Sequence, residues 1–346
     1  MDKDHLSALG RFGRISLVDN ATPIQRLHRL EQALGNESHG VRLFVKRDDL
    51  MGLGGGGNKL RKLEFLIGEA LAQQCDTFIT TGGLQSNHAR LSAAAAARTG
   101  LSCELVLTRA VPREDEEYRR NGNILLDGLF GAKIHELPGG SDALAFAQER
   151  AAALRKEGRR PYVVAATGGS TPVGCLGYAA CAMEIVAQEK ASYGTFAGIV
   201  LPNGSSGTHA GLAAGLAAQG MDPVRLQSFS VLAPAVTTRS KTHDLARATL
   251  ALLRDDVSID ASSIDVDGDQ LGDGYGIPTD AMFTAVRLMA RTEGLLLDPV
   301  YGGKAFAGLL AAVRKGVYQS GDAVLFLMTG GVPGLFAYRR AFDQQG

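Results

Sequence analysis

The sequence predicts an α/β fold built on open, mostly parallel sheets. Short runs rich in β-branched residues alternate along the chain with longer amphipathic or alanine-rich stretches. This alternation is typical of βαβ units and therefore of parallel sheets. Several short runs are apolar almost throughout, as expected for strands that helices cover on both faces. With 346 residues, the chain is long enough for one large domain or two of ordinary size.

The expected strands are short and bounded by polar or glycine-containing segments. In chain order they are VRLFVKR (41–47), DTFITT (76–81), SCELVLT (102–108), AKIHEL (132–137), PYVVAAT (161–167), AGIVLP (197–202), LQSFSVLA (226–233) and AVLFLMT (323–329). Helices are expected between most of them, including 59–74, 87–100, 141–158 and 171–190. The acidic, glycine-rich stretch 256–276 is interpreted as a surface excursion and not as a linker.

Composition excludes several classes of protein. Lys plus Arg equals Asp plus Glu, at 36 each, which gives no electrostatic reason to expect a nucleic acid as partner. The N-terminal residues lack the apolar stretch of a signal peptide, and no apolar run approaches the ~20 residues of a membrane span. The four cysteines form no CxxC pair, so they are interpreted as reduced thiols of a cytoplasmic protein. The scattered histidines predict no metal site.

In open α/β sheets, ligands bind where strands end and helices begin. The clearest such loop is NGSSGTHAGL, in which Gly204 and Gly207 flank Ser205 and Ser206, and a helix is expected from Thr208. Backbone N–H groups and hydroxyls there, with the positive end of the helix dipole, suit a phosphate. A tight turn with a threonine helix cap is the alternative interpretation.

Polar residues follow the ends of other predicted strands. Ser86, Asn87 and His88 open an alanine-rich helix, where they could bind an anion or simply cap the helix. Tyr301 precedes a glycine pair and another helix, and either lines a pocket or packs on the helix end. Thr329 follows the last strand, where its hydroxyl either meets a ring nitrogen or ends the strand.

Lys59 follows a run of four glycines and opens a predicted helix. The positive end of a helix dipole, together with burial, disfavours a charged lysine there, so Lys59 is a candidate reactive amine. A surface lysine at a helix start is the ordinary alternative. A nucleotide-binding P-loop is not supported, because Asn58 and Leu60 stand where its Lys and Ser or Thr belong. A G-x-G-x-x-G dinucleotide fingerprint after a strand is also missing from the sequence.

Taken together, these motifs resemble a known family. GGNKLRKLEF, GGLQSNHAR, NGSSGTHAGL, GYGIP, DPVYGGKAFAGL and TGGVPGLFAY are similar, in this order, to the pyridoxal-phosphate enzymes of the D-cysteine desulfhydrase and 1-aminocyclopropane-1-carboxylate deaminase family. The resemblance runs from Thr22 to Tyr338, nearly the whole chain. It implies the tryptophan-synthase-β-like fold of fold type II, with the cofactor between two open, twisted α/β domains. The expected domains are residues 1–59 plus 172–346, which would bind pyridoxal phosphate, and an inserted small domain, 60–171.

The resemblance also implies a cofactor site. Lys59 would hold pyridoxal 5'-phosphate as a Schiff base, and Lys62 would contact the phosphate. Asn87 would hydrogen-bond the ring hydroxyl oxygen, and Thr329 would meet the pyridine nitrogen. The remaining phosphate contacts would come from Gly204, Ser205, Ser206, Gly207 and Thr208.

The resemblance implies the substrate-binding residues as well. Ser86, with its neighbours Asn87 and His88, would face the carboxylate of a small amino acid. Tyr275 and Tyr301 would line the substrate pocket. The implied catalytic residues are Lys59, Ser86, Tyr275 and Tyr301. Members of the family are typically homodimers, and a membrane partner is not expected.

The implied activity is that of a carbon–sulfur β-eliminating lyase. The deaminase branch has Glu directly after the Tyr of D-P-V-Y, whereas this chain has Gly302 there and a hydroxyl at Thr329. Both departures favour the desulfhydrase side over cyclopropane ring opening, and leave L-cysteate and other β-substituted alanines as alternatives. A binding protein without catalysis would be marked by loss of Lys59, Ser86 or Tyr301, and all of them are present.

Overall fold

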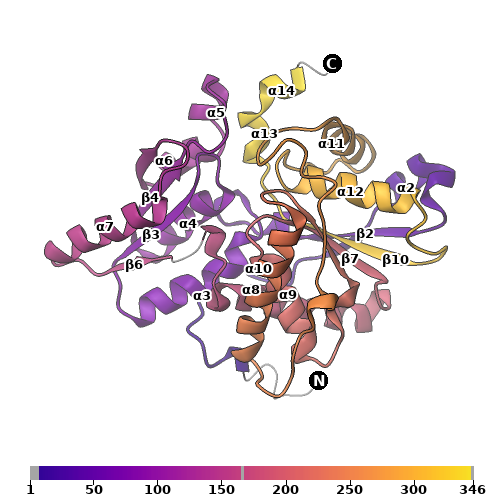
Figure 1. Ribbon diagram of the computed structural model, residues 1–346, viewed down its shortest axis with the longest axis horizontal. Coiled ribbons are helices and arrows are strands. Elements are labelled where there is room, and N and C mark those ends of the chain that lie inside the picture. Colours follow the sequence, from indigo (N-terminus) through magenta and orange to yellow (C-terminus); the bar gives the residue numbers. More distant parts are fainter. Residues whose placement is uncertain (1–7, 165–166, 344–346) are drawn as a thin grey trace.

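The computed structural model describes residues 8–164 and 167–343, and contains two open sheets (Figure 1). The order of the larger sheet is β1-β2-β10-β7-β8-β9, with β1 antiparallel to β2 and the other neighbours parallel. The smaller sheet has the order β5-β4-β3-β6 and is parallel throughout. The expectation of open, mostly parallel α/β sheets is therefore confirmed.

The strands lie close to the expected ranges. Their bounds are β1 (Ile24–Arg26), β2 (Arg42–Arg47), β3 (Thr77–Gly83), β4 (Ser102–Thr108), β5 (Lys133–Leu137), β6 (Pro161–Val163), β7 (Gly198–Asn203), β8 (Leu226–Ser230), β9 (Asp265–Asp267) and β10 (Ala323–Met328). The sequence missed β1 and β9, which are too short to show a period of two. The predicted strand 161–167 ends earlier than expected, and its residues 165 and 166 lie outside the described residues, as do residues 1–7.

Helices connect the strands and cover the sheets. Their bounds are α2 (His28–Leu34), α3 (Lys59–Ala72), α4 (Asn87–Thr99), α5 (Glu116–Arg120), α6 (Asn123–Leu129), α7 (Ala143–Lys156), α8 (Pro172–Gln188), α9 (Gly207–Ala218), α10 (Ala235–Ala251), α11 (Asp280–Glu293), α12 (Gly302–Arg314), α13 (Pro333–Ala337) and α14 (Arg339–Asp343). Figure 1 shows α11 and α12 on one side of β2, β7 and β10, and α8, α9 and α10 on the other.

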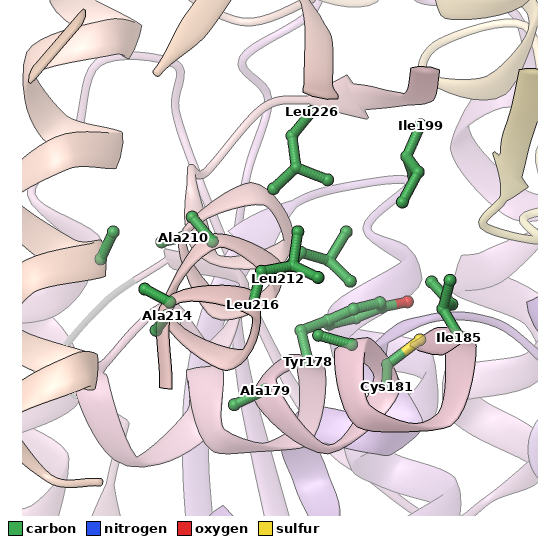
Figure 2. Close-up of a cluster of buried hydrophobic side chains, with 14 of the residues drawn as sticks. Tyr178, Ala179, Cys181, Ile185, Ile199, Ala210, Leu212, Ala214, Leu216 and Leu226 are labelled. Carbon is green, nitrogen blue, oxygen red and sulfur yellow. The ribbon is translucent and has the colours of Figure 1, made fainter. Parts of the chain in front are cut away.

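The central strands are buried on both faces because neighbouring residues enter different cores. Val324 and Phe326 of β10 pack with α11 and α12, whereas Leu325 and Leu327 pack with α8 and α9. Figure 2 shows the second core, in which Tyr178 of α8 faces the apolar side chains of α9. These two helices approach closely, since a Cβ added to Gly211 would lie 2.4 Å from the carbonyl oxygen of Cys175.

One described helix, Thr167–Tyr193, is long and apolar enough to cross a membrane by length and composition alone. It contains α8, and 61% of its most apolar window is buried inside the fold. The apolar character is therefore accounted for by packing against α9 in the core.

The two sheets come from separate parts of the chain. The strands of the smaller sheet all lie between residues 77 and 163, and those of the larger sheet lie before and after this segment. Figure 1 shows β3, β4 and β6 with α4, α6 and α7 on one side of the molecule, and the larger sheet on the other. We propose that the domains follow this division, as residues 1–59 plus 172–346 and residues 60–171.

A buried ionic network joins the start of α3 to α8. Asp48 is fully buried and accepts hydrogen bonds from Arg61 (Nη2, 2.8 Å), Tyr178 (2.6 Å) and Thr22 (2.8 Å). Arg61 also pairs with Glu184 of α8 at 2.9 Å. Burial by itself would raise the pKa of Asp48, but the charge and hydrogen bonds of Arg61 lower that pKa below its ordinary value. Asp48 is therefore ionised at neutral pH and holds the first turn of α3 against the core.

We expect Asp48→Asn to lower the free energy of unfolding by about 3–5 kcal/mol, because removing one partner of a buried ion pair leaves the other charge uncompensated. Urea unfolding followed by circular dichroism measures the loss. Glu37→Gln is the control: it breaks the exposed ion pair of Glu37 with Arg314 and should cost less than about 1 kcal/mol. Equal losses for the two variants would contradict this account of the network.

Candidate active site

A cavity of about 420 Å³ opens where strands of both sheets end. Its walls come from the loops that follow β3, β7 and β10, and from the loop that joins β5 to α7. A location outside the carboxyl ends of parallel strands is where such sheets bind ligands. Predicted site residues that line it are Lys59, Ser86, Asn87, His88, Gly204, Ser205, Ser206, Thr208, Tyr275, Tyr301 and Thr329. Lys62 and Gly207 lie behind this wall.

Lys59 is the first residue of α3, and its amine lies in the cavity. The side chain is half-buried, since it is surrounded by protein and accessible from the cavity. Burial, followed by repulsion from the charge of Lys62, lowers the pKa of Lys59 well below its ordinary value. The amine is thereby set up to act as a nucleophile and a base.

The glycine run before Lys59 is required by backbone geometry. Gly54, Gly55, Gly56 and Gly57 all have positive φ, at 60°, 79°, 74° and 131°. A Cβ on Gly56 would also lie 2.2 Å from the carbonyl oxygen of Asp49. Residues with side chains rarely adopt this conformation, so the run has to be glycine.

The loop from Gly204 to Thr208 forms a cup at the start of α9. Ser206 has φ 70° and its backbone N–H donates to Oδ1 of Asn203, which stabilises this turn. The buried hydroxyl of Ser206 has no hydrogen-bond partner in the described part of the protein. The twelve-residue helix α9 points its N-terminal end at the same place. This combination suits an anion.

Lys62 lies directly behind this cup. Its fully buried amine donates to Oγ of Ser170 (3.0 Å) and to the carbonyl oxygen of Gly168 (3.2 Å). Ser170 in turn donates to Oγ of Ser205 in the cup at 2.8 Å. Burial lowers the pKa of Lys62 to about 8. Lys62 therefore reaches the cup through a chain of hydroxyls, and its direct contact with a phosphate stays a prediction.

The start of α4 supplies the next wall of the cavity. Ser86 is the helix N-cap, because its hydroxyl accepts the N–H of Ala89 at 3.1 Å. His88 is buried and its Nε2 pairs with the hydroxyl of Thr80 at 2.9 Å. Burial, together with the positive charges of Lys59 and Lys62, lowers the pKa of His88 well below its ordinary value. His88 is therefore a neutral imidazole at the cavity wall.

Two tyrosines, Tyr275 and Tyr301, are in contact with each other at the wall of the cavity. The hydroxyls of Tyr275 and Tyr301 are 2.7 Å apart. Burial, followed by the influence of Tyr275, raises the pKa of Tyr301 well above its ordinary value, so its hydroxyl keeps its proton at neutral pH. The sequence predicted both residues from separate motifs, and the tertiary structure brings them into contact.

Buried charges hold both tyrosines in place. Asp298 accepts the backbone N–H groups of Val300 (2.9 Å), Tyr301 (2.7 Å) and Gly302 (2.8 Å), which fixes the start of α12. From the first turn of the same helix, the amine of Lys304 donates to carbonyl oxygens of the loop that carries Tyr275. One helix therefore sets the positions of both hydroxyls.

Thr329 follows β10 at the floor of the cavity and is buried. Its carbonyl oxygen accepts the N–H of Asn58 at 3.0 Å, and a Cβ on Gly57 would lie 3.1 Å from that same oxygen. The glycine run and the end of β10 are thus packed together. This contact places Lys59 and Thr329 on the same cavity.

Sequence reasoning missed part of the cavity wall. Ser141, Asp142, Ala143 and Leu144 approach from the start of α7, and Leu232 from the loop after β8. Their motifs are ordinary helix starts and turns, so nothing in the sequence marks them. Asn203 and Asn58 stand beside predicted motifs and could have been found as their neighbours. Across the described ranges, His, Cys, Asp and Glu form no group that could hold a metal ion.

Comparison with known proteins gives matches over nearly the whole chain. Residues 15–330 match the family model described as pyridoxal-phosphate dependent enzyme. The D-cysteine desulfhydrase of Serratia proteamaculans (strain 568) is 41% identical over 95% of this chain and 97% of its own, and that of Salmonella typhi is 41% identical over 96% and 98%.

Solved structures show the same fold. The crystal structure of an ACC deaminase homologue superposes with a TM-score of 0.86 and 36% identity, and covers 99% of each chain. A hydrogen sulfide-producing enzyme from Fusobacterium nucleatum superposes with a TM-score of 0.59 at 18% identity, over 92% of this chain and 97% of its own, and shares the fold.

Proposed function

Since this chain belongs to the family of pyridoxal-phosphate dependent enzymes, we propose that it is a lyase that converts D-cysteine and water to pyruvate, sulfide and ammonia. The observation that carries the proposal is a lysine of lowered pKa that shares one cavity with a pair of protonated tyrosine hydroxyls. The 41% identity to D-cysteine desulfhydrases over nearly the whole chain supports the same reaction.

The cavity residues fit pyridoxal phosphate. The cup at Gly204–Thr208 offers an unpartnered buried hydroxyl and a helix N-terminus to the phosphate, and Lys59 offers a reactive amine to the aldehyde. A volume of about 420 Å³ lies in the usual range for a small-molecule site. When bound, the cofactor supplies an electron sink for the negative charge left at Cα of the substrate.

The chain's own residues then have separate roles. The neutral amine of Lys59 takes the proton from Cα. Ser86, Asn87 and His88 hold the substrate carboxylate at the start of α4, where the helix dipole favours an anion. Tyr301, hydrogen-bonded to Tyr275, gives a proton to the departing sulfur. Carbon–sulfur cleavage then leaves an unsaturated amine, which water converts to pyruvate and ammonia.

A second candidate activity is that of an ACC deaminase, because the solved structure with a TM-score of 0.86 is of an ACC deaminase homologue. Position 302 argues against it. Gly302 donates its N–H to Asp298, and a Cβ there would already lie 3.1 Å from the carboxylate of Asp298. A glutamate at this position would bring two carboxylates together, at a cost in free energy.

A substrate panel tests the proposal. D-cysteine, L-cysteine, D-serine, L-cysteate, β-chloro-D-alanine and 1-aminocyclopropane-1-carboxylate are each offered to the purified enzyme, and keto acid and sulfide are measured. We expect D-cysteine to give equal amounts of both, with a kcat/KM at least ~100-fold above that of the cyclopropane substrate. Keto acid from the cyclopropane substrate alone would overturn the assignment.

We also propose that the enzyme is a cytoplasmic homodimer without nucleic-acid or membrane partners. The described cysteines are all free thiols, which suits a reducing compartment. Leu125 and Leu129 of α6 and Phe336 of α13 are exposed on two helices in contact, which suits an interface between copies of the chain. Light scattering of the purified protein measures the oligomeric state.

A further inference from the structure

Asn123, the first residue of α6, is buried beside the cavity wall at 1% exposure. Its side-chain amide nitrogen donates to Oδ1 of Asn87 at 3.0 Å and to the backbone carbonyl oxygen of Gln85 at 3.0 Å. Its backbone N–H donates to Oε1 of Gln85 at 2.9 Å. Asn123 is outside every motif that marks the site in the sequence, yet it touches a residue that lines the cavity.

These contacts determine which way both asparagine amides face. A backbone carbonyl oxygen can only accept, so the group of Asn123 that faces the Gln85 carbonyl must be its NH₂. The second hydrogen of that NH₂ points to Asn87, and Asn87 must therefore present its oxygen to α6. Nδ2 of Asn87 then faces away from α6, towards Gly331, where an added Cβ would lie 2.7 Å from it.

Hydrogen bonds of Gln85 also fix the orientation of these amide groups. Nε2 of Gln85 donates to the carbonyl oxygens of Tyr118 (2.6 Å) and Asn121 (2.8 Å), so Gln85 must present Oε1 to the N–H of Asn123. Every contact that fixes Gln85 and Asn123 has a backbone group on one side, which has a fixed role as donor or acceptor, and the contact of Asn123 with Asn87 joins two side chains. The turn before α6 thus transmits a single orientation to Asn87.

We propose that Asn123 is a positioning residue, which holds the amide of Asn87 so that its Nδ2 donates to the ring hydroxyl oxygen of pyridoxal phosphate. This rests on the proposed function and on the contact of Asn87 with the ring hydroxyl oxygen that the family resemblance implies. If Asn87 were reversed, it would present its carbonyl oxygen to another oxygen, and a favourable hydrogen bond would become a repulsion. Asn123 itself makes no contact with the cofactor in this scheme.

Asn123→Asp tests the proposal, because a carboxylate cannot donate and draws the NH₂ of Asn87 towards α6. Pyridoxal phosphate is titrated into the apoenzyme of each variant and followed by its visible absorbance. We expect Asn123→Asp to bind it about 10- to 100-fold more weakly than the unaltered protein, the size of one lost hydrogen bond to a charged group. The pH midpoint of the cofactor absorbance should shift upwards, since the ring oxygen loses a donor.

Asn121→Asp is the matched control, because it adds the same charge to an exposed residue that contacts Gln85 only through its backbone carbonyl, which the substitution keeps. It should bind the cofactor like the unaltered protein. Asn123→Ala, which frees Asn87 without reversing it, should lie between the two and decides the question if Asn123→Asp does not fold. Equal cofactor affinity and equal pH midpoints for the Asn123 and Asn121 variants would overturn the proposal. Failure of the unaltered protein to bind the cofactor would instead overturn the proposed function.

Discussion

Lys59→Ala is expected to lower kcat for D-cysteine at least ~10³-fold, because the variant lacks the amine that takes the Cα proton, and general base catalysis alone contributes about 10²–10⁴-fold. The lowered pKa of Lys59 gives the sign of a pH effect: the neutral amine forms at a lower pH than for an ordinary lysine, so a larger share of the base is present at a given pH, and this share is lost as the pH falls. Pyruvate formation under saturating substrate measures the change.

Two further variants test whether the amine of Lys59, and not a positive charge at this position, is required. Lys59→Arg fixes a positive charge at the start of α3, because a guanidinium cannot lose its proton, so this variant should be as inactive as the alanine variant. Lys315→Ala removes an exposed lysine and should leave kcat unchanged. After borohydride treatment, peptide mass spectrometry should find the cofactor attached at Lys59. A loss of kcat smaller than about tenfold in Lys59→Ala would refute the role given to this residue.

Tyr301→Phe should lower kcat for D-cysteine by about 10²-fold or more, because it removes the hydroxyl that gives a proton to sulfur. Burial keeps the pKa of Tyr301 above its ordinary value, so the donor form is present at neutral pH and is lost only in strongly alkaline solution. The unaltered enzyme should therefore show no loss of activity from this group between pH 7 and about 9.

The effect of Tyr301→Phe should depend on the leaving group of the substrate. Chloride needs no proton to depart, so Tyr301→Phe should change the turnover of β-chloro-D-alanine by no more than about threefold, whereas D-serine should be affected at least as strongly as D-cysteine. Tyr318→Phe, which alters a half-buried tyrosine packed near the start of β7, is the control and should act normally on all of these substrates. An equal loss on chloride and sulfur substrates would show that Tyr301 does not act as the acid.

Local patterns predicted most of the framework. The strand Ser102–Thr108 has the bounds expected from its apolar run, and helices begin at Lys59 and Asn87 as expected. Such patterns depend on neighbours within a few residues, which is why they can be read without the fold. The short strands β1 and β9 escaped because their residues carry too little periodicity, and they exist through pairing with β2 and β8.

Contacts over long sequence distances could not be predicted in this way. The resemblance implied that Lys62 contacts the phosphate, which stays a prediction, and only the structure shows that its amine lies between Ser170 and Gly168. Asn123 belongs to none of the motifs found in the sequence, and it touches Asn87, 36 residues away, only in the folded protein. Asp48 is likewise outside these motifs, and the fold brings Arg61 and Tyr178 to its carboxylate.

By itself, the sequence determined the α/β class and marked the strand ends and the candidate lysine after its glycine run, because period, turn chemistry and helix starts are local properties. Only the tertiary structure decided which of these groups meet: that Tyr275 lies against Tyr301, that Lys62 stands behind the cup, and that Asn87 is oriented by α6. Hydrogen bonds and burial depend on distances in space between residues that are far apart in the chain, and folding alone sets those distances.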